Sequence, residues 1–147
     1  GTEILMKNFT DPNDGMVRQG FPGGWPEDTL NKFDRAQRTA AENEAYDFVK
    51  RLAQWRQKTP AVTQGKLMQF VPDKGVYTYF RYTEDQAVMV LMNGQKEARV
   101  VDLKRFAERT SGYATGKDVV SGESYPVTPT DTVTVPAKTT LILELAR

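Results

Sequence analysis

Apolar residues change their spacing at Pro60, and this change limits the fold that the chain can adopt. Before Pro60, apolar residues recur every three or four positions, a spacing typical of an amphipathic helix. After Pro60, short segments alternate between apolar and polar residues and are separated by turn residues, a pattern typical of β-strands. We therefore predict one long helix followed by a β-rich domain.

The long helix is predicted at residues 40–57. Thr39 is a candidate N-cap, and Glu42 three residues later completes a capping-box pattern. Pro60 ends the helical pattern, because proline disrupts a helix interior. One face of this helix is apolar and must be buried against another part of the protein. That face consists of Ala45, Phe48, Val49, Leu52 and Ala53.

Turn residues divide the rest of the chain into short strands. Residues 86–93 are apolar on both sides, which indicates a central strand. Asn93-Gly94 predicts a hairpin to the following strand, and residues 103–109 are predicted to form one or two helical turns. This pattern favours a mainly β fold, an antiparallel β-sandwich. Its strands are predicted at residues 66–71, 76–83, 86–93, 98–101, 117–120, 131–135 and 139–145.

The first 38 residues differ in composition from the rest. They contain two clusters of turn residues, at 11–15 and 21–26. A loop of this length is uncommon in a compact domain unless it is functional or disordered. Its aromatic residues argue against disorder, so we predict an ordered functional loop that needs a packing partner. These aromatic residues are Phe9, Phe21, Trp25 and Phe33.

Composition excludes several classes of function. The chain has no cysteine and no histidine, so disulfides, thiolate metal sites and histidine bases are excluded. A net charge of +1 gives no field that favours nucleic acid or an anionic membrane. No apolar run is long enough for a membrane span. We expect no cofactor, and the compartment, bacterial cytoplasm or periplasm, stays open.

The acidic residues do not indicate catalysis or metal binding. Their pairs fall in loops, a first helical turn and a hairpin turn, where acidic side chains have structural roles. Asp11, Asn13 and Gly15 match three positions of a calcium loop, but the closing glutamate is absent. We therefore predict no catalytic residue and no metal ligand. The pairs are Asp11 with Asp14, Glu42 with Glu44, and Glu84 with Asp85.

Two aromatic features are candidates for sugar contact. Tyr77 and Tyr79 share one face of a predicted strand with Arg81, where they either stack on sugar rings or cover the sheet. We favour the covering role, because a two-layer fold buries such faces. Trp25 lies in a Pro-Gly-Gly turn, where an aromatic side chain has no core role by default, so it either contacts a sugar or packs its loop against a further domain.

The sequence resembles the α-amylase family, glycoside hydrolase family 13, and within it the neopullulanases and cyclomaltodextrinases. The fairly specific stretch is Phe21-Pro22-Gly23-Gly24-Trp25, and the likeness covers essentially the whole chain. It is carried by Gly1–Met6, Asp14–Trp25, Arg38–Ala45, Leu52–Arg56, Phe70–Pro72, Val76–Tyr82, Pro136–Thr139 and Leu141–Leu145.

The resemblance implies a position inside a larger enzyme. Residues 1–60 would be the last loop and helix of a (β/α)8 catalytic barrel, and residues 61–147 a Greek-key C-terminal β-sandwich. The catalytic nucleophile, acid/base and third carboxylate of the family lie on earlier barrel strands, so this chain would be non-catalytic. It would be the C-terminal fragment of a retaining hydrolase that degrades starch, pullulan or cyclomaltodextrins. The alternative is a stand-alone α-glucan-binding module.

The resemblance also implies roles for loop residues and partners. Arg18 would hydrogen-bond sugar hydroxyls at the rim of the substrate cleft, Phe21 and Trp25 would stack on glucose rings, and Glu3 would stabilise the rim. The expected partners are an α-glucan or maltooligosaccharide, bound through the larger enzyme, and the upstream barrel. Without the barrel, the apolar helix face at Phe48 is expected to form a homodimer or to fold against the sandwich.

Overall fold

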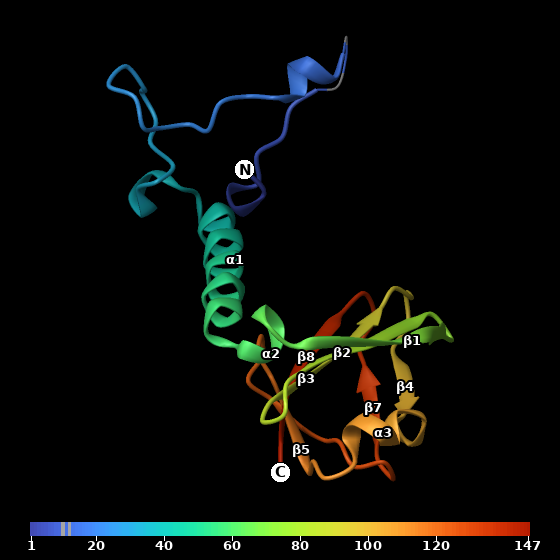
Figure 1. The fold of residues 1–147 in the computed structure, drawn as a ribbon. Coiled ribbons are helices and arrows are strands. Elements are labelled where there is room, and N and C mark those ends of the chain that lie inside the picture. The colour runs from blue at the N-terminus through green and yellow to red at the C-terminus, as the bar shows by residue number, and fades with distance from the viewer. Residues whose placement is uncertain (10, 12) are drawn as a thin grey trace. The chain divides into compact units, whose positions relative to one another are not determined.

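A computed structural model describes residues 1–9, 11 and 13–147. Pro12, part of the predicted turn cluster at 11–15, lies outside the described residues. The chain divides into two compact units, Gly1–Gln54 and Trp55–Arg147. Figure 1 colours the first unit blue to green and the second green to red.

The first unit consists mostly of loop and one long helix. Three short 3-10 helices interrupt the loop: η1 (Thr2–Ile4), η2 (Asp14–Val17) and η3 (Arg35–Gln37). The helix α1 (Ala40–Lys58) begins in this unit and confirms the prediction for residues 40–57. The capping box is present: the Thr39 N–H donates to Glu42 Oε2 at 2.7 Å, and the Glu42 N–H donates to Thr39 Oγ1 at 3.3 Å.

The second unit is an antiparallel β-sandwich, which confirms the predicted fold class. A six-stranded sheet has the strand order β1-β2-β3-β8-β5-β6, and a two-stranded sheet pairs β4 with β7. The strands are β1 (Lys66–Asp73), β2 (Val76–Tyr82), β3 (Ala87–Asn93), β4 (Arg99–Asp102), β5 (Thr115–Asp118), β6 (Ser124–Pro126), β7 (Thr132–Val135) and β8 (Thr140–Ala146). Short helices complete it: α2 (Pro60–Thr63), η4 (Leu103–Phe106) and α3 (Ala107–Thr110).

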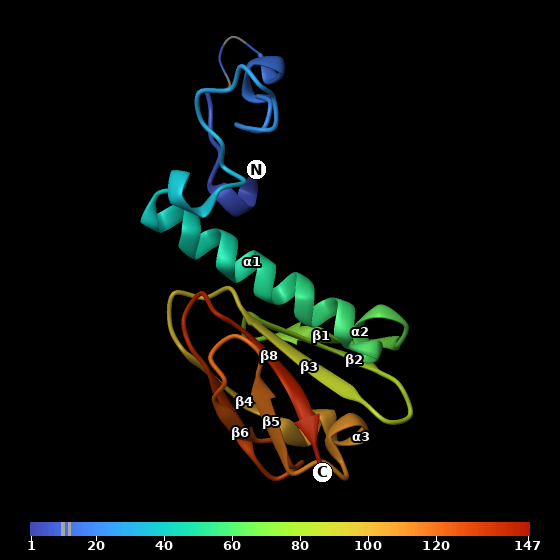
Figure 2. The ribbon, with the colours of Figure 1, turned by 90° about the vertical axis from the view of Figure 1, so that its left-hand side faces the viewer.

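Strand β3 lies inside the large sheet, between β2 and β8, as Figure 2 shows. One face of this sheet contributes Phe80, Met89 and Leu143 to the main core, together with side chains of the small sheet and of η4. The opposite face carries Val88 and Val90, which Ala61 of α2 and Trp55 cover. Both faces of β3 are therefore buried, which explains why its sequence is apolar throughout.

The predicted hairpin at Asn93-Gly94 is wrong. The chain leaves the large sheet after Asn93, at the end of β3. The next strand, β4, pairs with β7 in the small sheet. The Asn93 side chain is 4% exposed, and its amide donates to three backbone carbonyls, those of Glu97, Val135 and Pro136, at 2.8, 3.1 and 2.9 Å. Asn93 therefore anchors a crossing between the two sheets.

Candidate functional site

The three loop residues with implied sugar contacts differ in their surroundings. Trp25 is 73% exposed, and its backbone N–H donates to Asp28 Oδ2 at 3.0 Å. Arg18 is exposed and directly follows η2. Phe21 is half-buried against Phe33, with ring centroids 4.5 Å apart. Two of the three, Arg18 and Trp25, are therefore free to meet a ligand, whereas Phe21 shapes the turn.

The Gly23-Gly24 turn folds onto a later segment of the same loop. The Lys32 N–H donates to the Pro22 carbonyl at 2.8 Å. Gly23 has a φ of 115°, and a Cβ at this position would lie 2.8 Å from the Asn31 Cα. No other residue type fits this close approach, so glycine at this position fixes where Trp25 is presented.

An ion pair between the buried Lys32 and the half-buried Glu42 ties this loop to the start of α1. Lys32 Nζ lies 2.6 Å from Glu42 Oε2 and donates to the Gln37 carbonyl at 2.9 Å. The Lys32 residue is 8% exposed. The hydrogen bond from Lys32 and that from the Thr39 N–H hold the pKa of Glu42 below its ordinary value of 4.5. The capping residue of α1 therefore also anchors the loop.

Arg38 is a second buried cation at this junction. Its guanidinium lies 3.9 Å from the ring centroid of Tyr46, donates to Asn43 Oδ1 at 2.8 Å, and donates to the Lys32 carbonyl at 3.0 Å. This network around Arg38 was not predicted from the sequence. A signal existed for Lys32, because it precedes a capping box whose Glu42 supplies a carboxylate.

The apolar face of α1 is not buried in this chain. Phe48 and Val49 are 43% and 41% exposed, and α1 contains no buried residue. Among the described residues 1–54, Ile4 is the single buried apolar side chain. The first unit is thus held by charged and hydrogen-bonded contacts, and Phe48 and Val49 on its apolar helix face stay partly exposed.

In the second unit, Tyr77 and Tyr79 lie side by side on the outer face of β2. Their ring centroids are 5.6 Å apart, and Tyr77 Oη lies 2.6 Å from Gln69 Oε1. Arg81 donates to the carbonyls of Ala61 and Val62 at 3.3 and 2.9 Å. A shallow hollow of about 400 Å³ lies beside these side chains. Arg81 is engaged in hydrogen bonds to α2 and is not available to a ligand. The side chains of this face therefore cover the sheet and do not form a ligand site.

The described residues contain no group of three or more acidic side chains arranged to hold a metal ion. Glu84 and Asp85 lie in the turn between β2 and β3, and Glu42 is used in the capping box. None of the helices in the described residues is long and apolar enough to cross a membrane.

Comparison with known proteins identifies the sandwich. A family model described as the cyclo-malto-dextrinase C-terminal domain matches residues 67–144. An α-amylase from Geobacillus thermoleovorans, complexed with acarbose, shares 16% identity over 85% of this chain and 27% of its own, with a TM-score of 0.62. A maltogenic α-amylase from Thermotoga neapolitana shares 19% identity over 72% of this chain and 26% of its own, with a TM-score of 0.57.

An Anoxybacillus α-amylase gives a similar result, with 16% identity, 84% coverage of this chain and a TM-score of 0.60. The present chain spans only 26% of the length of that protein. At these identities the solved structures establish the fold, while the match at residues 67–144 establishes the family. The chain belongs to the cyclo-malto-dextrinase C-terminal domain family.

Proposed function

We propose that this chain is the non-catalytic C-terminal portion of a retaining α-glucan hydrolase that degrades starch, pullulan or cyclomaltodextrins. In this proposal, the sandwich supports a catalytic barrel, and the loop and helix of residues 1–60 complete that barrel. The chain itself supplies no acid or nucleophile for glycoside hydrolysis, which needs two carboxyl groups placed across the sugar.

One observation carries this proposal: the apolar face of α1 is exposed, whereas the sandwich has its own core. Phe48 is 43% exposed, whereas Phe80 in the sandwich is fully buried. A helix that needs an apolar contact, and a domain that already has one, together indicate that the helix completes another domain. In enzymes of this kind, that domain is the catalytic barrel.

The rim contacts belong to the same proposal. We propose that Arg18 and Trp25 contact the bound glucan at the edge of the cleft and that Phe21 holds their turn in place. Their exposure and the fixed turn at Gly23 support these roles. Glu3, in the short helix η1, would support the start of this loop.

The proposal is tested first by assaying the purified chain with maltoheptaose, β-cyclodextrin and pullulan. We expect no release of reducing sugar above the buffer rate. Release that persists after repurification would show that the chain is itself catalytic, and the proposal would be wrong.

The supporting role is tested in trans. The barrel portion of a cyclomaltodextrinase, truncated after its eighth strand, is assayed with and without this chain. We expect the chain to raise the hydrolysis of β-cyclodextrin, and Phe48→Asp to abolish this gain. Lys50→Asp, on the polar face of the same helix, is the matched control. An equal rate with and without the wild-type chain would contradict the supporting role.

The alternative of a stand-alone binding module has less support. It relies on Tyr77 and Tyr79, whose rings are half-buried and whose neighbour Arg81 is committed to α2. This arrangement is the one expected of side chains that cover a sheet.

A further inference from the structure

The second unit contains a cavity at one end of the sandwich, with a volume of about 760 Å³. Along the inward face of β2, Val76 and Phe80 are buried, but Tyr82 at the end of the strand is only half-buried. The cavity lies over Tyr82, at the end of this inward face of β2.

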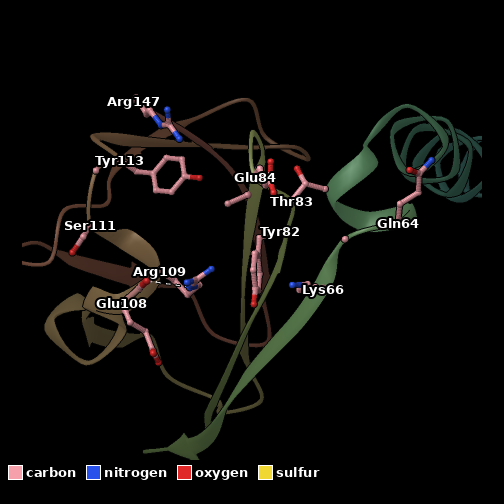
Figure 3. A pocket seen from close by; sticks show the side chains of 13 residues that line it. Gln64, Lys66, Tyr82, Thr83, Glu84, Glu108, Arg109, Ser111, Tyr113 and Arg147 are labelled. Atoms are coloured by element: carbon pink, nitrogen blue, oxygen red, sulfur yellow. Dashed lines mark hydrogen bonds between the residues drawn. The ribbon is translucent and has the colours of Figure 1, made fainter.

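Four segments line the cavity. The residues 64–66 before and at the start of β1 form one side, and the turn after β2 forms another. The end of α3 and the following residues, 108–113, form a third side, and the end of the chain at Arg147 forms the fourth. Figure 3 shows Tyr82 near the middle of the cavity, with Lys66 on one side and Tyr113 on the other.

Two tyrosine rings give the cavity its apolar surface. The guanidinium of Arg109 lies 4.2 Å from the Tyr82 ring centroid, and that of Arg147 lies 5.9 Å from the Tyr113 ring centroid. Each arginine orients one ring. Within the described residues, neither tyrosine hydroxyl makes a hydrogen bond, although both side chains are half-buried. Two hydroxyl groups in a cavity are thus available to a ligand.

Charged side chains of both signs surround these rings. Lys66 lies directly opposite Tyr82 in the β1–β2 register, and Arg109 adds further N–H donors. Glu84 and Glu108 are exposed at the cavity and supply acceptors. Because cations and carboxylates are interleaved, the cavity does not concentrate one sign of charge. This mixture disfavours a simple anion or cation and suits a neutral ligand with many hydroxyl groups.

We propose that this cavity binds a short neutral oligosaccharide of two or three glucose units. A glucose ring has an apolar face of C–H groups and a rim of hydroxyls, which match the tyrosine rings and the surrounding donors and acceptors. A cavity of this size accommodates such a ligand. The choice of an α-linked glucan rests on the proposed function, whereas the site itself rests on the cavity chemistry.

Binding is tested on the full chain by calorimetry with maltotriose, with cellotriose as the β-linked comparison. We expect weak binding of maltotriose that becomes about three- to tenfold weaker in Tyr82→Leu and in Tyr113→Leu, since each loses one ring contact. Tyr77→Leu is the matched control, because this tyrosine lies on the same strand β2 but on its opposite face. Circular dichroism and a thermal melt establish that each variant is folded.

Lys66→Ala provides a test that leaves the core unchanged, because this side chain is exposed. We expect it also to weaken maltotriose binding. No binding by the wild-type chain, or a loss in Tyr77→Leu with none in Tyr82→Leu and Tyr113→Leu, would overturn the proposed site. Binding of cellotriose alone would overturn its assignment to α-glucans. The trans assay with the barrel does not depend on this cavity, so the proposed function and this site can fail independently.

Discussion

The two units of this chain reach an ordered structure by different means. Residues 55–147 bury two apolar clusters on the two faces of one sheet. Residues 1–54 are held mainly by Lys32, Arg38 and their hydrogen-bond partners, while the apolar face at Phe48 stays exposed. The difference indicates that polar contacts can fix the local path of a loop, but that burial of apolar surface makes a domain independent.

The largest expected effect separates two phenylalanines. Phe80→Ala removes a fully buried ring from the sandwich core, and we expect a loss of about 3–5 kcal/mol in the free energy of unfolding. Phe48→Ala in α1, where the side chain is 43% exposed, should cost less than about 0.5 kcal/mol. Urea unfolding followed by circular dichroism measures both. Similar losses in the two variants would show that α1 is packed in solution, by dimerisation or against the sandwich.

A matched pair of asparagines gives the next effect. Asn93→Ala leaves the Glu97, Val135 and Pro136 carbonyls without their amide donor, and we expect a cost of about 2–3 kcal/mol. Asn43→Ala removes donors to loop carbonyls in the first unit, and it should leave the unfolding of the sandwich unchanged. Urea titrations compare the two midpoints. If Asn43→Ala lowered the urea midpoint as much as Asn93→Ala, the two units would not differ in how they are stabilised.

The two tryptophans report on one unit each. Trp55 packs on Val88 and donates from Nε1 to Glu144 Oε1 at 2.8 Å, so Trp55→Phe should cost about 1 kcal/mol. Trp25 is 73% exposed, and Trp25→Phe should not change stability. Acrylamide quenching checks the environments. In Trp55→Phe only Trp25 emits, and we expect strong quenching of its fluorescence. In Trp25→Phe only Trp55 emits, and we expect weaker quenching. Equal quenching would contradict the difference in burial.

The smallest effect concerns pH. The pKa of Glu42 is lowered in the folded state, first by its hydrogen bond to Lys32. This carboxylate therefore stabilises the loop–helix junction above its unfolded pKa, and the stabilisation is lost as the pH falls through the lowered folded value. We expect amide exchange at residues 32–42 to accelerate in that acidic range and the sandwich to be unaffected. Glu42→Gln should remove this pH dependence. If the variant keeps it, another group is responsible.

Local patterns were sufficient to predict much of the fold. The capping box and Pro60 defined α1, and the two-sided apolar segment identified β3 as a central strand. These features follow from nearest-neighbour chemistry and from burial, both of which the sequence records directly. The antiparallel sandwich followed from the number and spacing of the strands.

Features that depend on distant partners were missed. The Asn93-Gly94 pattern correctly marked a change of direction, but no local signal says which sheet the next strand joins. Strand β6 is three residues long and pairs with β5 at the sheet edge, so it carries almost no periodicity. Pro60 ended the predicted helix, but it is also the first residue of α2, a position that suits proline.

The candidate sites also divide into features that local sequence predicts and features that depend on distant partners. The exposure of Trp25 was predictable from its Pro-Gly-Gly turn, because such a turn has no core role of its own. The cavity at Tyr82 was not predictable, since it depends on where the small sheet ends and on which residues after α3 approach the end of β2.

The position of β3 beside β8 also sets the order of events during synthesis. Residues 87–93 cannot complete their pairing until residues 140–146 have left the ribosome, because β8 supplies the second neighbour of the central strand. Until then, the hairpins of β1, β2 and β3 have one apolar edge unpaired, which is a hazard for aggregation.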